Sequence, residues 1–149
     1  MEIDYKKQGK SNRARGKAFE LKVRHDLEKK GWIVDRWSNN VEFDKIIDKE
    51  GEPVYTYPVG KLITAKHTFN PFTKAMSAGN GFPDFICIKR QEETNEETFK
   101  PHFFVKFVEC KINGKLDKIE KEKIEWLKDN LHIHTIIAVK GERGEIIYE

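Results

Sequence analysis

The strongest constraint on the fold is the stretch FFVKFVECKING, residues 103–114, which has the β-branched and aromatic content of a buried strand yet ends in charged residues. Side chains alternate across a strand, so Glu109 and Lys111 project from the same face as Phe107. That face begins apolar and ends with a carboxylate and an ammonium group. The pattern indicates a polar site at one corner of a sheet.

The length and composition of the chain are typical of one globular domain. With 149 residues, of which 38% are apolar and 36% charged, we expect residues 1–149 to fold around a single core. The sequence contains no apolar run of roughly eighteen residues and no apolar N-terminal segment, which predicts a cytoplasmic protein without a membrane partner. Cys87 and Cys110 lack the paired spacing of a zinc site and are predicted to be buried.

The N-terminal segment is unusually basic. Residues 1–24 carry eight lysine and arginine residues against three acidic residues, a net charge of +5. A basic arm of about residues 1–12 is either a solvated segment or a contact for an anionic partner. If that partner is DNA, the candidate phosphate contacts are Lys6, Lys7, Lys10, Arg13, Arg15 and Lys17.

Residues 12–30 have the apolar spacing of an amphipathic helix, and Gly31 follows as a stop signal. The apolar stripe comprises Phe19, Val23 and Leu27, broadened by Ala18 and Leu21. Glu20 lies three positions before Val23 and seven before Leu27, so we expect its carboxylate on the inner side of the helix. A carboxylate in that place needs a compensating partner.

The rest of the chain predicts strands and a second helix. Strands are expected at residues 32–37, 44–47, 53–57, 61–65, 83–90, 103–111, 134–139 and 144–149. Residues 66–81 show no clear period and are predicted to form a long loop. Asp117 and Glu120 have the spacing of a capping box that starts a helix; its apolar side is expected to comprise Ile119, Ile124, Trp126, Leu127 and Leu131. This order predicts a central mixed β-sheet flanked by helices, an α/β or α+β fold.

Two of the predicted strands bring charged ends together. If the strand that begins at Pro83 pairs antiparallel with the strand that ends at Lys111, Asp84 lies beside Glu109. With Glu20 arriving from the first helix, three carboxylates repel one another unless a cation compensates them. Oxygen ligands suit Mg²⁺, with Mn²⁺ as a substitute. A carboxylate-held cation beside a lysine suits the hydrolysis of phosphodiesters.

Three segments resemble the motifs of the PD-(D/E)XK nuclease superfamily, particularly its archaeal Holliday junction resolvases and its virus-type replication-repair nucleases. The segment RGKAFELKV resembles the first-helix glutamate motif, GFPDFI the PD motif, and VECKINGKL the ExK motif with its glycine turn. The resemblance implies a restriction-endonuclease-like fold, with Lys111 as the catalytic lysine. It also implies a metal site formed by Glu20, Asp84, Glu109 and the backbone carbonyl of Cys110.

Two features depart from these branches. A glutamine often sits on the helix after the ExK motif, where this sequence has Lys123, which is either a lysine that extends out of the core or a phosphate contact. The segment 38–82 is also longer than in compact junction resolvases. Within it, bases and aromatic residues mix at Lys66, His67, Phe69, Phe72 and Lys74. They suit either contacts with single-stranded or distorted DNA or a loop that covers the core.

The sequence therefore predicts a Mg²⁺-dependent endodeoxyribonuclease that cuts branched DNA, with Lys74 and Lys123 as DNA contacts in addition to the basic N-terminal residues. Two symmetrical cuts in a four-way junction require two sites, which predicts a homodimer. The alternatives are a DNA-binding module without turnover, or a nuclease that acts on flapped, linear or single-stranded DNA. The intact set of carboxylates and lysine favours catalysis.

Overall fold

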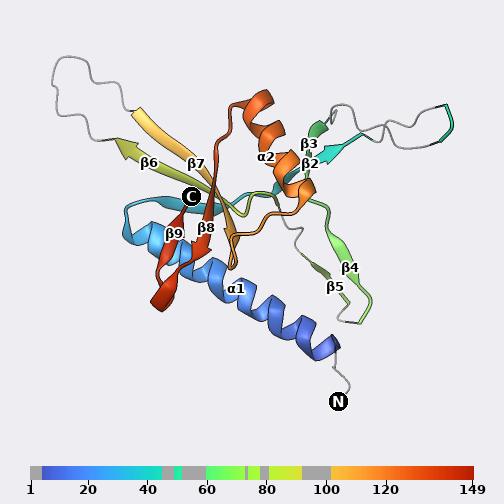
Figure 1. Cartoon of the computed structure of the whole chain (residues 1–149), viewed down its shortest axis with the longest axis horizontal. Helices are drawn as coiled ribbons and strands as arrows, with labels where there is room; N and C mark the ends of the chain where they lie inside the picture. The colour runs from blue at the N-terminus through green and yellow to red at the C-terminus, as the bar shows by residue number, and fades with distance from the viewer. Residues whose placement is uncertain (1–4, 45–48, 52–59, 73, 78–80, 92–101) are drawn as a thin grey trace.

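A five-stranded mixed sheet with two helices forms the centre of the molecule (Figure 1). The computed structural model describes residues 5–44, 49–51, 60–72, 74–77, 81–91 and 102–149. The elements are α1 (Tyr5–Lys29), β1 (Ile33–Arg36), β2 (Asn39–Phe43), β3 (Gly60–Thr64), β4 (Thr68–Asn70), β5 (Ala75–Ser77), β6 (Phe85–Gln91), β7 (His102–Lys111), α2 (Lys118–Leu131), β8 (Thr135–Lys140), the 3₁₀ turn η1 (Glu142–Gly144) and β9 (Ile146–Tyr148). The predicted mixed α/β class is therefore confirmed.

The central sheet has the strand order β1-β6-β7-β8-β9. Its neighbours pair antiparallel except for β7 and β8, which run parallel and are joined through α2. A parallel pair needs such a crossover connection, whereas the antiparallel pairs do not. The predicted strands at 32–37, 83–90, 103–111, 134–139 and 144–149 are all present in this sheet.

Helix α1 packs on one face of the sheet through its predicted stripe. Phe19, Val23 and Leu27 are buried against residues of four strands, namely Val34, Phe85, Cys87, Val108 and Ala138. The helix ends where Gly31 adopts a φ of 83° and the N–H of Trp32 donates to the carbonyl of Leu27 (3.1 Å).

Two details of α1 differ from the prediction. The helix begins at Tyr5, so the described part of the predicted basic arm is helical rather than an extension before the helix. Leu21 and Ala18 are exposed and do not broaden the stripe. The helix meets the sheet along a narrow line of contact, and the sequence pattern does not show how wide that line is.

Helix α2 begins at the predicted capping box. The carboxylate of Asp117 accepts from the backbone N–H of Glu120 (2.8 Å), and the carboxylate of Glu120 accepts from the N–H of Asp117 (2.9 Å). Leu127 is buried with Val41 and Phe82, next to Ile124 and Trp126. Ile119 and Leu131 are exposed, contrary to prediction, because the helix packs through its middle against the β2–β3 ribbon.

The segment 38–82 differs most from the prediction. Strand β2 precedes the strand predicted at 44–47 and pairs with β3 in a separate ribbon, so β3 does not continue the central sheet. Residues 45–48 and the strand predicted at 53–57 lie outside the described residues. The predicted loop at 66–81 contains a second ribbon, β4–β5. Each of its strands has only three residues, too few for a period of two to be recognised in the sequence.

Candidate functional site

The start of β6 and the end of β7 meet at one corner of the sheet. Phe85 pairs with Val108 in antiparallel register, so the preceding residue, Asp84, faces Glu109 across the two strands. One carboxylate oxygen of Asp84 accepts a hydrogen bond from the backbone N–H of Cys110 (2.8 Å). The predicted juxtaposition of the two acidic residues is therefore present, and the register of a single strand pair produces it.

Glu109 is a buried carboxylate without full compensation. Glu109 is only 5% exposed, and its Oε2 atom has no hydrogen-bond partner among the described residues. Burial, followed by the charge of Asp84, raises the pKa of Glu109 to about 8, and Lys111 only partly offsets this. A buried carboxylate in this state has an unmet demand for positive charge.

Asp84 has the same demand to a smaller degree. Burial raises its pKa to about 6; the hydrogen bond from Cys110 opposes the shift and the charge of Glu20 adds to it. The charge of Asp84 in turn increases the preference of the facing Glu109 for the protonated form. Such a pair is suited to sharing a cation.

Lys111 lies between two carboxylates. Its Nζ atom is 3.3 Å from Oε1 of Glu109 and forms a hydrogen-bonded ion pair with Oε1 of Glu120. Burial alone would lower the pKa of Lys111, but the bond to Glu120 and the charge of Glu109 raise it above its ordinary value. The lysine therefore remains protonated at neutral pH and can offset negative charge, whereas it is not suited to accepting a proton.

Glu20 lies at the edge of this corner. Its Oε2 atom is 3.4 Å from Nη2 of Arg36, and its charge contributes to the raised pKa of Asp84. Within the part of the chain that the structure describes, no three His, Cys, Asp or Glu side chains are arranged as a metal site. The structure thus brings Asp84, Glu109 and Lys111 together and pairs Glu20 with an arginine.

The donor set nevertheless fits a hard divalent cation. Asp84 and Glu109 offer carboxylate oxygens, the ligands that Mg²⁺ and Mn²⁺ prefer. The unpartnered Oε2 atom of Glu109 and the raised pKa values of both residues indicate that the corner lacks positive charge. Magnesium typically takes only one or two carboxylates from a protein and keeps several waters.

The remaining predicted residues have varied positions. Lys123 donates from Nζ to Oδ1 of Asn40 (2.8 Å) and lies 5.4 Å from the ring centroid of Phe82, so it joins α2 to β2 and is half-buried. Lys74 is exposed on the β4–β5 ribbon. The predicted DNA contacts on α1 that the structure describes are all exposed, namely Lys10, Arg13, Arg15 and Lys17; the side chains of Lys6 and Lys7 are outside the described part.

The two cysteines differ in burial. Cys87 is fully buried in the α1 core, as predicted, and burial raises the pKa of its thiol to about 11. Cys110 is only half-buried against the same core, so the prediction that it is buried is wrong for this residue. Its backbone N–H donates a hydrogen bond to the carboxylate of Asp84.

Two residues of the site were not predicted from the sequence. Glu120 was identified only as a helix cap, although it also binds the ammonium group of Lys111. Its place in the first turn of the helix that follows the ExK strand is a usable signal. Arg36 was missed because its pairing with Glu20 depends on packing between α1 and β1; its register opposite Phe85 could have indicated that it lies near Asp84.

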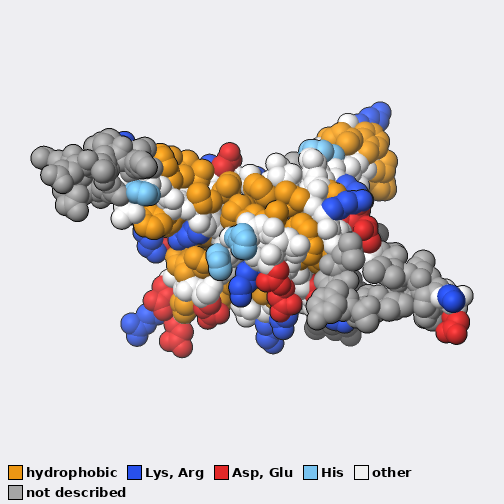
Figure 2. Space-filling view, turned by 90° about the horizontal axis from the view of Figure 1, so that it is seen from above, with side chains coloured by type: hydrophobic (Ala, Val, Ile, Leu, Met, Phe, Trp, Pro, Cys, Tyr) orange, Lys and Arg blue, Asp and Glu red, His pale blue; other side chains and the backbone are white. Residues whose placement is uncertain are grey.

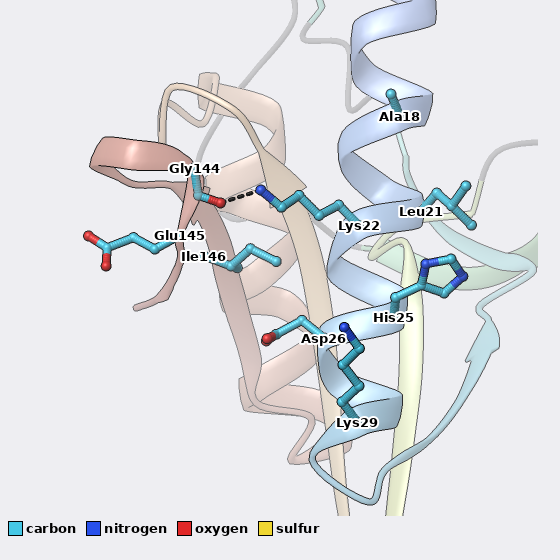
Figure 3. A pocket seen from close by; sticks show the side chains of 9 residues that line it. All are labelled: Ala18, Leu21, Lys22, His25, Asp26, Lys29, Gly144, Glu145 and Ile146. Carbon is cyan, nitrogen blue, oxygen red and sulfur yellow. Dashed lines mark hydrogen bonds between the residues drawn. The ribbon is translucent and has the colours of Figure 1, made fainter.

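A cavity of about 380 Å³ lies away from this corner, between α1 and the segment of η1 and β9 (Figure 3). Two of its charged side chains have protein partners. Lys22 donates from Nζ to the carbonyl of Gly144, and Asp26 accepts from Lys30 (2.7 Å) and from the hydroxyl of Tyr148 (2.6 Å). The charges of Lys22 and Asp26 are therefore already compensated within the protein.

Comparison of the chain with protein-family models, with curated proteins and with solved structures gave no match. Of the helices in the described residues, neither α1 nor α2 has the length and apolar character required to cross a membrane.

Proposed function

We propose that the protein is a Mg²⁺-dependent endonuclease with a restriction-endonuclease-like fold, which hydrolyses phosphodiester bonds in branched DNA. The observation that carries this proposal is the facing pair of carboxylates, the buried Glu109 and the half-buried Asp84, beside the protonated Lys111. The PD and ExK segments that supply these three residues are the ones that resemble the nuclease motifs. A corner with excess negative charge and one fixed ammonium group suits a cation and a phosphate together.

Each residue of the corner has a separate task in this proposal. Asp84 and Glu109 hold the cation, with Glu20 and the backbone carbonyl of Cys110 as the further protein ligands. When bound, Mg²⁺ supplies Lewis-acid activation of the phosphate and of a water molecule. Lys111 offsets the negative charge that grows on the phosphate oxygens, because Glu120 keeps its ammonium group protonated.

DNA binding is assigned to basic residues outside the corner. The predicted phosphate contacts on α1 are Lys6, Lys7, Lys10, Arg13, Arg15 and Lys17, and Lys74 and Lys123 contribute from the β4–β5 ribbon and from α2. A four-way junction needs two symmetrical cuts, so the proposed assembly is a homodimer. Strand β9 lies at an edge of the central sheet and offers one surface for it.

The test is cleavage of labelled four-way junctions, flaps, linear duplexes and single strands, with Mg²⁺ or with EDTA. We expect Mg²⁺-dependent cutting, which Asp84→Asn and Glu109→Gln abolish while DNA binding persists, because phosphate contacts elsewhere supply the affinity. Glu122→Gln is the matched control, since Glu122 pairs with Lys118 on α2, away from the corner. Tight binding by the unmodified protein without any cutting would instead identify a DNA-binding module.

A further inference from the structure

The β4–β5 ribbon carries exposed apolar side chains on a projecting hairpin (Figure 1). Phe69 and Met76 pair across the two strands, so they share one face, and they are 56% and 60% exposed. Phe72 lies in the turn and is 96% exposed. Figure 2 shows hydrophobic side chains exposed on this projection as well as along the sheet. These aromatic residues therefore do not cover the core, which removes one of the two interpretations of the sequence.

The tip of the ribbon has a defined conformation. The backbone N–H of Phe72 donates to Oδ1 of Asn70 (2.9 Å), a local bond that fixes a turn. Lys74 follows with a φ of 51°, in the left-handed region. The exposed phenyl ring of Phe72 is thus held next to a local hydrogen bond, and a group of exposed apolar side chains is a candidate interaction site.

Both ends of the ribbon are anchored beside the carboxylate corner. The N–H of Ala65 donates to the carbonyl of Ser38 (2.8 Å), and the N–H of Phe82 donates to the carbonyl of Asn39 (2.8 Å). Gly81 lies so close to the backbone of Trp37 that a Cβ atom there would be 1.6 Å from the carbonyl oxygen. Asp84 follows two residues after Phe82, so the ribbon and the corner share one continuous attachment.

The charge of this segment favours a polyanion. Between Ala65 and Pro83 the sequence has two lysines and one histidine but no aspartate or glutamate. Lys66 pairs with Glu42 at the base of the ribbon (2.7 Å), whereas Lys74 is exposed near the tip. Exposed aromatic residues next to basic residues are typical of platforms for single-stranded nucleic acid. A second copy of the same ribbon fits less well, because like charges would face each other.

We infer that the β4–β5 ribbon stacks its aromatic side chains, chiefly Phe72, on unpaired nucleobases next to the scissile phosphate. The substrate class is then nucleic acid in which an unpaired segment adjoins a duplex. This inference rests on the proposed nuclease function and assigns its substrate preference to a hairpin that is not part of the central sheet.

The test measures affinity without divalent cation. The probes are a duplex with a single-stranded tail that contains 2-aminopurine and a blunt duplex with the same number of phosphates. We expect the unmodified protein to bind the tailed duplex more tightly and to quench 2-aminopurine. Phe72→Ala should raise the Kd for the tailed duplex by about 5- to 150-fold, the range of one lost base stack, and leave the Kd for the blunt duplex unchanged.

Two variants serve as controls. Phe72→Trp retains a stacking ring and should keep the preference for the tailed duplex. Phe104→Ala removes another exposed phenylalanine; Phe104 is 53% exposed, which is similar to Phe69. Phe104 lies on the face of β7 opposite to Glu109, so this variant should change neither Kd. Thermal unfolding of each variant should match the unmodified protein, because the substituted side chains are exposed.

The outcomes separate this inference from the proposed chemistry. Equal loss of both affinities in Phe72→Ala, or no loss, overturns the stacking role even if Mg²⁺-dependent cutting is observed. A loss of affinity for the tailed duplex alone supports the stacking role even if no DNA is cut. The absence of cutting would then contradict only the proposed nuclease activity. If light scattering shows that Phe72→Ala only converts a dimer into monomers, the ribbon is a contact between copies and the inference is overturned.

Discussion

Strand β7 carries two half-buried lysines on opposite faces, and their surroundings contrast. Lys106 lies on the α1 face, with its Nζ atom 4.0 Å from the ring centroid of Trp32 and 5.4 Å from that of Tyr148. Burial, together with repulsion by Lys30 and Lys89, lowers its pKa. Aromatic faces accommodate this cation.

Lys111 lies on the other face between Glu109 and Glu120, and its pKa is raised. The two lysines show that partial burial of a charged side chain does not by itself indicate function. The class of partner is informative: aromatic rings stabilise Lys106 as part of the packing, whereas the carboxylates around Lys111 exceed the available positive charge, as the proposed cation site requires.

The largest expected effect is a difference in cleavage rate between variants of the two lysines. Lys111→Met should slow cleavage of a labelled junction at least about 100-fold, as the loss of a group that stabilises developing charge does. Lys106→Met should cut at the normal rate, because Lys106 faces away from the corner. Single-turnover rates at saturating Mg²⁺ provide the measurement, and equal losses in the two variants would remove the distinction.

A second expected difference concerns stability and pH in EDTA. The pKa values of Asp84 and Glu109 are raised from 3.8 to about 6 and from 4.5 to about 8, so the folded state binds protons more tightly than the unfolded state. Their contribution to stability is fully present below pH about 4 and is lost as the pH rises through 6 and 8. The free energy of unfolding should fall by on the order of a few kcal/mol over this range, since one pKa unit corresponds to about 1.4 kcal/mol.

Urea unfolding at several pH values measures this slope. Added Mg²⁺ should restore stability chiefly near pH 8, where the carboxylates are ionised. Glu109→Gln should flatten the slope, while Lys106→Met should leave it unchanged. A flat slope in the unmodified protein would contradict the assignment of the raised pKa values to this corner.

The smallest expected effect tests how Glu120 acts on Lys111. Glu120→Gln removes the negative charge beside the ammonium group, so the pKa of Lys111 should fall; ¹³C NMR of labelled lysine side chains measures it. Asp117→Ala is the matched control, because it removes the helix cap at a cost of about 1 kcal/mol without removing that charge. A similar fall in both variants would show that the cap, rather than the charge, sets the pKa.

The sequence was informative wherever neighbours along the chain determine structure. The alternation in β7, the glycine stop after α1 and the capping box of α2 are local patterns, and each predicted its element. Antiparallel pairing then placed Asp84 opposite Glu109 without further information. These parts of the fold and site can be predicted from the spacing of apolar residues and from the register of one strand pair.

The features that were missed depend on packing between distant segments. The pairing of Glu20 with Arg36 joins a helix to a strand, and the bond of Glu120 to Lys111 joins the sheet to α2. The exposure of Phe72 depends on the ribbon projecting from the body, which a mixture of bases and aromatic residues does not indicate. Amino-acid pattern restricts which face is apolar, but the extent to which a neighbour covers that face is a tertiary property.

The close approach of Gly81 to Trp37 bears on how this protein can diverge. The clash at 1.6 Å is with a backbone oxygen, so even alanine would force the main chain apart, and no rotamer could relieve it. A library randomised at this position and selected for folding should therefore return glycine alone. Sequence and length can vary toward the tip of the ribbon, whereas the root that leads to Asp84 stays fixed.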